Sequence, residues 1–173
     1  MLKKKYKRRG EGFDKESWEE YSQRLSIPDE KAQIHFYEHV VFDHHGLFNS
    51  RFPWFNIEDF EFKFEEWTAN KIFQKIKYDN CKEIDFYYQK YDEGGTEWLL
   101  DYMKEHITWP IPIVLFNFNV EELHQVRKLS GGGRLCEVHL IEGCRRTSFL
   151  KKLLLNGKIT GESKHKILIL STK

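Results

Sequence analysis

The chain has 173 residues, with 28 Lys and Arg against 27 Asp and Glu, and its formal net charge is +1. Hydrophobic residues make up 40% and aromatic residues 16%, which excludes an intrinsically disordered chain because so apolar a sequence can bury enough surface to offset its conformational entropy. The longest apolar runs, residues 111–118 and 167–170, are far shorter than the roughly 20 residues that a membrane-spanning helix requires. We expect a single folded domain with an extension.

The charge is distributed unevenly along the chain. Residues 1–10 contain six basic and no acidic residues, residues 11–142 contain 14 basic and 26 acidic residues, and residues 143–173 contain eight basic residues and one acidic residue. Such asymmetry is more informative about partners than the total charge. We interpret residues 1–12 as a basic flexible tail in solvent, and the alternative is a contact with nucleic acid through phosphate neutralisation.

Cysteine usage and the N-terminal sequence bear on the cellular compartment. The three cysteines, Cys81, Cys136 and Cys144, are an odd number and lack the spacing of metal ligands. No apolar segment follows the basic start of the chain, so we expect no secretory signal. These features predict a reduced, cytoplasmic protein.

Residues 13–95 form an aromatic-rich region whose pattern predicts mainly helices. One helix is expected over residues 14–25, and Ser26 is expected to cap a second helix with Pro28 near its first turn. Phenylalanine alternates with charged residues over residues 60–65, which is typical of a half-buried strand.

The end of this region contains a short helix and a connector. Thr68 is expected to cap the helix, and residues 79–95 are acidic and end in two glycines, as a connector would. We therefore place a boundary after residue 95, with residues 13–95 packed against the core that follows.

Residues 96–173 have the pattern of an α/β (α+β) core. The expected elements, in order, are a helix capped by Thr96, a strand at 111–118, an added helix within 119–134 closed by glycines 131–133, a strand at 135–141, a helix at 145–156 stopped by Gly157, and a strand at 167–170. The first of these helices is expected to bury Trp98, Leu99, Tyr102 and Met103.

The most informative segment is the turn between the second of these strands and the helix that follows it. The strand ends at Glu142, Gly143 makes the turn, and the helix begins with Cys144, Arg145 and Arg146. Free N–H groups and the helix dipole favour an anion at such a helix start, and an arginine binds phosphate through two parallel N–H bonds. The segment therefore predicts a phosphate site, and the alternative is an arginine pair in surface salt bridges.

The block from Glu142 to Arg146 resembles the Gly-x-Arg-Arg nucleotide-binding motif of the ParB/sulfiredoxin superfamily. The upstream helix, the proline-containing start of the strand at residues 111–114, and the order of the later elements also resemble that superfamily. The resemblance covers residues 96–173, and the segments around Tyr102-Met103 and Trp109-Pro110 are similar to those of uncharacterised bacterial ParB-like proteins.

The resemblance implies a ParB/sulfiredoxin-like core, with a small mixed sheet and helices, in which Gly143, Arg145 and Arg146 hold nucleotide phosphates. N–H groups near Gly143 and Cys144 are expected to assist. The further residues that we expect at this site are Thr147 and Ser148 as donors, with His139 and His165 lining it from adjacent strands.

Cys144 matches the cysteine of the Gly-Cys-His-Arg motif of sulfiredoxin, where the cysteine is catalytic. Because Arg145 stands where sulfiredoxin has histidine, we expect Cys144 to be a small residue facing the site; the alternative is a reactive thiolate with a lowered pKa. No ParB-type helix-turn-helix follows the core, so we do not expect a partition-type DNA clamp.

Two further candidates lie outside the turn. His35 and His39 have the His-x-x-Glu-His spacing of an inverted zincin on one helix face, but no specific third ligand follows, and we expect polar-edge histidines and no zinc. Glu97, in the first turn of a helix, is a candidate general base or Mg²⁺ ligand, against helix capping as the alternative.

We predict a domain that binds a nucleotide or other phosphorylated ligand, such as a nucleoside triphosphate or diphosphate with Mg²⁺. Nucleotide-dependent phosphotransfer or hydrolysis is the reaction class that the resemblance implies. The rival prediction is a non-enzymatic regulatory or interaction protein, namely a DNA-associated, toxin–antitoxin or phage-defence component. Its basic termini would contact nucleic acid and its acidic region a protein partner. We expect no membrane association.

Overall fold

The computed structural model describes residues 4–10, 14–76, 85, 97–129 and 135–173. Within these residues the protein has a mixed α/β fold with a four-stranded sheet in the order β1-β4-β2-β3. β1 (Phe60–Thr68) runs antiparallel to β4 (Lys164–Thr172), β4 runs parallel to β2 (Ile113–Asn117), and β2 runs antiparallel to β3 (Val138–Glu142). The described helices are α1 (Trp18–Leu25), α2 (Lys31–Phe36), the π-helical segment η3 (Tyr37–Phe42), α3 (Asp43–Arg51), α4 (Ala69–Lys75), α6 (Glu97–His106), α7 (Val120–Leu129) and α8 (Cys144–Leu155), with short 3-10 turns at Lys4–Tyr6 and Ile57–Asp59.

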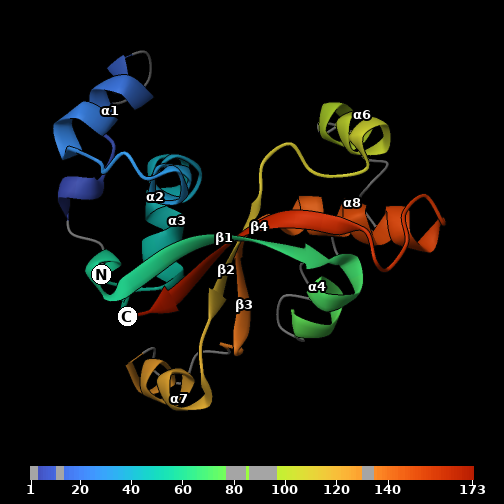
Figure 1. The fold of residues 1–173 in the computed structure, drawn as a ribbon. Helices are drawn as coiled ribbons and strands as arrows, with labels where there is room; N and C mark the ends of the chain where they lie inside the picture. Colours follow the sequence, from blue (N-terminus) through green and yellow to red (C-terminus); the bar gives the residue numbers. More distant parts are fainter. Residues whose placement is uncertain (1–3, 11–13, 77–84, 86–96, 130–134) are drawn as a thin grey trace.

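The sheet separates two hydrophobic clusters. Alternate residues of the central strands face opposite sides, so Val114 and Phe116 pack with the aromatic residues of the N-terminal region, while Ile113 and Leu115 pack with residues of α4, α6 and α8. Figure 1 shows α1 to α3 on one side of the sheet and α4, α6 and α8 on the other. All four of these β2 side chains are 0% exposed, which confirms that the apolar run is a strand buried on both faces.

The N-terminal region contributes a strand to this sheet and does not only pack against it. β1 pairs with β4 along its whole length, from Phe60 opposite Thr172 to Thr68 opposite Lys164. The phenylalanines of β1 face the aromatic cluster, and Thr68 accepts a hydrogen bond from the Lys71 N–H as the cap of α4. The predicted strand and cap are thus confirmed, and the sheet crosses the boundary expected after residue 95.

The described part of the basic N-terminal segment is attached to the fold through Tyr6, while the side chains of Lys5, Lys7 and Arg9 are exposed to solvent. Tyr6 is buried in the aromatic cluster, and its carbonyl accepts a hydrogen bond from the Tyr21 hydroxyl at 2.8 Å. Arg24 donates to the Lys5 carbonyl at 2.7 Å and also to Glu16, whose pKa it lowers to about 2. A buried ring and fixed carbonyls hold the segment, which composition alone does not reveal.

Two other helix predictions differ from the structure. The first helix begins at Trp18 and not at residue 14, because Ser17 and Glu20 form a capping box there. Ser26 ends this helix in a left-handed conformation with φ 48° and does not cap the next one, since α2 begins at Lys31 with Glu30 as its N-cap. Trp98 is 62% exposed, since Leu99 and Met103, one turn apart, form the buried side of α6. The expected cap Thr96, the three glycines at 131–133 and all but Asp85 of the connector lie outside the described residues.

Candidate functional site

The turn between β3 and α8 is built around a glycine that no other residue can replace without strain. Gly143 has φ +112°, a conformation that side chains disfavour, and a Cβ at this position would overlap the side chain of Ile113 in the neighbouring central strand. The predicted glycine turn is present, and the missing side chain lets the start of α8 lie directly against the sheet.

The N-terminus of α8 has the features of an anion site. The helix is 12 residues long, its N-cap residue Gly143 has no side chain that could cap it, and its first turn contains no acidic residue. By contrast, Ser17 and Thr68 cap α1 and α4 with their hydroxyl oxygens. The first N–H groups of α8 thus lack a side-chain acceptor from the N-cap position, and the helix dipole favours a negative charge there.

The two arginines of the turn have different surroundings. Arg145 is exposed, whereas Arg146 is only 7% exposed and forms an ion pair with Glu142. Arg146 also donates from Nη1 to the Ile111 carbonyl at 2.8 Å, and burial lowers its pKa to about 10. Arg146 therefore remains a cation at neutral pH, but its guanidinium is already bound by groups of the protein.

The structure brings the two histidines of α2 and η3 to the same end of the sheet. His35 donates from Nε2 to the Pro112 carbonyl at 3.1 Å, and its ring centroid lies 4.6 Å from that of His39. Burial, followed by the neighbouring His39, lowers the pKa of His35 to about 4, and the charges of Arg146 and Lys166 act in the same direction. Burial also lowers the pKa of His39, with a further contribution from Arg146.

His35 and His39, which have the spacing of an inverted zincin, both lie near other polar groups of the protein. His35 uses Nε2 for the Pro112 carbonyl, and His39 lies 3.8 Å from the Glu38 carboxylate. In the part of the chain that the structure describes, no group of three or more His, Cys, Asp or Glu side chains is arranged to hold a metal ion. His39 lies in the π-helical segment η3, a kind of helix irregularity that is common at functional sites, and His35 lies just before it in α2.

The other residues expected at the turn lie deeper in the fold. Thr147 and Ser148 are fully buried, and Thr147 donates its hydroxyl to the Gly143 carbonyl at 2.9 Å. His139 faces Phe52, with ring centroids 5.7 Å apart. His165 is 2% exposed, and burial lowers its pKa to about 4. Thr147, Ser148 and His165 are thus buried, and His139 is half-buried.

The remaining candidates differ in accessibility. Cys144 is half-buried at the first position of α8, and Glu97 is exposed in the first turn of α6, a helix whose buried side packs on the opposite face of the sheet from His35. The sequence did not indicate that Glu142 and the Ile111 carbonyl are the partners of Arg146. These contacts arise from the turn at Gly143 and from the pairing of the strands, which no local pattern reveals.

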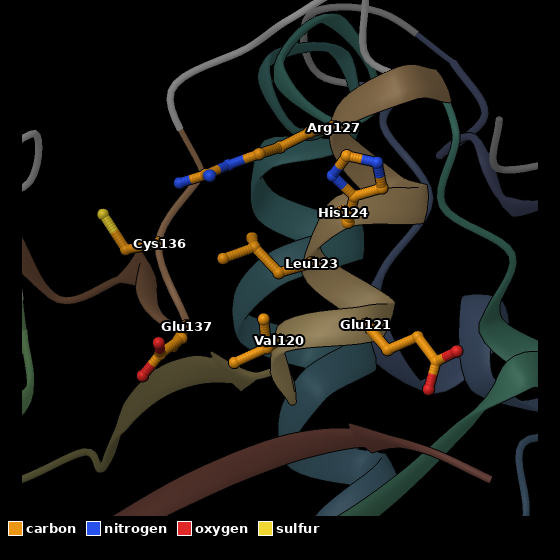
Figure 2. A pocket seen from close by; sticks show the side chains of 7 residues that line it. All are labelled: Val120, Glu121, Leu123, His124, Arg127, Cys136 and Glu137. Carbon is orange, nitrogen blue, oxygen red and sulfur yellow. The ribbon is translucent and has the colours of Figure 1, made fainter.

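A separate hollow of about 620 Å³ lies at the other end of β3. Figure 2 shows Val120 and Leu123 of α7 facing the segment that carries Cys136 and Glu137, with Arg127 reaching across. Arg127 donates to the Leu135 carbonyl from both Nε and Nη2. A strand of this length spans roughly 17 Å, so the hollow is distinct from the α8 turn, and it contains none of the predicted site residues.

Comparison with known proteins leaves the chain without an assigned family. No protein-family model, no curated protein and no solved structure matches it. Among the described helices, none is both long and apolar enough to cross a membrane. The functional assignment therefore depends on the geometry of the β3–α8 turn.

Proposed function

We propose that the β3–α8 turn binds the phosphate group of a nucleotide or another phosphorylated ligand. The observation that carries the proposal is the start of α8, where a glycine N-cap and a first turn without acidic residues are combined with the exposed Arg145. Phosphate oxygens would accept hydrogen bonds from the N–H groups of Cys144 and Arg145, and the Arg145 guanidinium would neutralise the charge.

The surroundings of the turn support this role. Gly143 lets the start of α8 lie directly against Ile113 of the sheet, which fixes the position of the first turn of the helix. The nearby His35 is neutral at pH 7 because burial lowers its pKa to about 4, so it neither attracts nor repels an anion by charge.

The resemblance to the ParB/sulfiredoxin superfamily extends the proposal to a nucleoside diphosphate or triphosphate with Mg²⁺. Nucleotide-dependent phosphotransfer or hydrolysis is the corresponding reaction class. Cys144 and Glu97 remain the candidate catalytic residues, and binding can be tested without assuming either role.

The test is calorimetric titration of the full chain with CTP, ATP and ADP, with and without Mg²⁺. We expect binding of at least one nucleotide, and a loss of roughly 10- to 100-fold in affinity in Arg145→Ala, because one charge-assisted hydrogen-bonding group is removed. Lys158→Ala is the matched control, since Lys158 is an exposed cation beyond the other end of α8. The proposal is wrong if no nucleotide binds at millimolar concentration and Arg145→Ala has no effect.

One observation favours the rival function, an interaction protein that contacts nucleic acid. Lys5, Lys7 and Arg9 are exposed on a segment that Tyr6 and Arg24 fix in place. Titration with short duplex DNA at two salt concentrations tests it, because phosphate contacts give a steep salt dependence. Tighter binding to DNA than to any nucleotide, lost in Lys5→Ser/Lys7→Ser/Arg9→Ser, would favour this alternative.

A further inference from the structure

β1 is a nine-residue strand at one end of the sheet order, and only one of its two edges is paired. Its inner edge pairs with β4 from Phe60 to Thr68 without a break in register. In the part of the chain that the structure describes, no backbone hydrogen bond joins residues 61–67 to a segment on the outer side. Figure 1 shows β1 as an outer strand of the sheet. It contains neither a proline nor a bulge, two features that commonly protect an exposed edge.

The hydrogen bonds just beyond the two ends of β1 show which of its residues face outward. Lys173 donates its N–H to the Asp59 carbonyl at 3.0 Å, and Ala69 donates its N–H to the Ser163 carbonyl at 2.9 Å. Odd-numbered residues of β1 therefore direct their backbone groups toward β4, because bonded and non-bonded pairs alternate along an antiparallel ladder. The residues whose N–H and C=O groups face outward are consequently Phe62, Phe64 and Glu66.

We propose that the outer edge of β1 binds the same edge of a second copy of this chain. The two β1 strands run antiparallel across a twofold axis at Phe64, and the two sheets become one continuous sheet. The Phe64 N–H of each copy donates to the Phe64 carbonyl of the other, and the outward groups of Phe62 bond to those of the partner's Glu66.

The charges of β1 select this register. With Phe64 on the axis, all nine residues of the strand are paired, and Lys63 lies opposite the partner's Glu65 on both sides of the axis. An axis at Lys63 places two lysines opposite each other, and an axis at Glu65 does the same with two glutamates, which is destabilising. An axis at Phe62 leaves the second half of the strand unpaired. A second copy therefore complements this edge in both charge and length.

The side chains beside the axis are accessible for this pairing. The side chains of Lys63 and Glu65 are 75% and 34% exposed. Trp67 donates from Nε1 to one carboxylate oxygen of Glu65 at 2.8 Å, and the other oxygen lies 3.6 Å from the Lys63 ammonium. Phe62 and Phe64 are half-buried, and pairing removes more of their surface from water. Backbone hydrogen bonds and these rings supply the affinity, while the charges fix the register.

The experiment measures the mass of the full chain by sedimentation equilibrium at roughly 1 to 500 μM protein. We expect a monomer–dimer equilibrium with a dissociation constant of about 1–100 μM, because an interface of one strand pair is small. Glu66→Pro removes one outward N–H from each copy without removing a bond to β4, and it should weaken the dimer at least about tenfold. Glu66→Ala keeps this N–H and should dimerise as the unmodified protein does.

Two charge variants test the register. Lys63→Glu places carboxylates opposite each other and Glu65→Lys places ammonium groups opposite each other, so each variant alone should dimerise roughly tenfold more weakly. An equimolar mixture of the two restores opposite charges on both sides of the axis and should form heterodimers as tight as the unmodified dimer. Lys128→Glu makes the same charge change at an exposed site on α7 and should leave dimerisation unaltered.

The outcomes separate a second copy from any other partner of this edge. A dimer that Glu66→Pro weakens, and that the mixture of Lys63→Glu with Glu65→Lys restores, supports the proposal. A chain that stays monomeric at every concentration overturns it, because the edge then serves another strand or none. Equal dimerisation of Glu66→Pro and Glu66→Ala overturns it as well, and so does a mixture that dimerises no better than its components. The charge variants decide the result if Glu66→Pro does not fold.

Discussion

His35 and Arg146 hold the carbonyl groups of two consecutive residues, although they are far apart in the sequence. Arg146 donates to Ile111 at 2.8 Å and His35 donates to Pro112 at 3.1 Å. The start of β2 is therefore held from α8 by one side chain and from α2 by the other. This arrangement joins the aromatic N-terminal region to the proposed phosphate turn.

His35 should make stability depend on pH in the acidic range. Burial lowers its pKa in the folded protein from 6.5 to about 4, so the unfolded chain binds more protons between these values and stability falls as pH decreases through this window. We expect a loss of roughly 2–3 kcal/mol from this residue, measured by urea unfolding from pH 7.5 to 4.5.

His35→Gln should flatten this pH dependence because its amide can still donate to Pro112 but does not titrate. His165, whose pKa is also about 4 in the folded protein, should contribute a similar loss of unfolding free energy over the same pH range. His106→Gln, at an exposed site, is the control and should leave the slope unchanged. If neither His35→Gln nor His165→Gln changed the dependence of unfolding free energy on pH, these two histidines would not be its source.

Gly143→Ala should destabilise the protein by roughly 2–4 kcal/mol, from left-handed strain together with overlap with Ile113. Ile113→Ala in the same chain should recover the part due to overlap, as a double-mutant cycle of unfolding free energies would show. Gly157→Ala separates the backbone strain from the overlap, because Gly157 also has a left-handed φ of +66° but has open space around its Cβ position. Equal losses for Gly143→Ala and Gly157→Ala would show that Ile113 does not restrict the turn.

Tyr6→Ala should release the basic N-terminal segment. The Tyr6 ring is buried and lies 5.9 Å from that of Tyr37, so its loss removes the apolar anchor that keeps Lys7, Arg8 and Arg9 against α1. Trypsin should then cleave after these residues at least about tenfold faster, since cleavage follows the population of the open form. Tyr6→Phe keeps the ring and should be cleaved at the rate of the unmodified protein. If trypsin cleaved the unmodified protein and both Tyr6 variants at one rate, the Tyr6 ring would not be what holds the segment.

Substitutions in α6 should show which side of the helix is buried. Met103→Ala should cost roughly 2–5 kcal/mol because Met103 is 0% exposed. Trp98→Ala should change the unfolding free energy by less than about 0.5 kcal/mol, as is usual for exposed positions, since Trp98 is 62% exposed. The unfolding free energies of both variants are measured by chemical denaturation. A larger loss of unfolding free energy for Trp98→Ala than for Met103→Ala would show that Trp98 is on the buried side of α6.

The sequence by itself determined the local elements of this protein. The alternation in β1, the apolar run of β2, the cap at Thr68 and the glycines at 143 and 157 predicted elements that the structure contains. These signals are local, because periodicity, capping and left-handed glycine depend on residues close together in the chain.

Only the tertiary structure decided how these elements combine. β1 joins the sheet beside β4, the buried Tyr6 ring fixes the basic N-terminal segment, and His35 lies against the Pro112 carbonyl at the start of β2. It also showed that Arg145 is exposed while Arg146 is buried against Glu142. Such differences between neighbouring residues arise from packing between distant segments, which no short sequence pattern encodes.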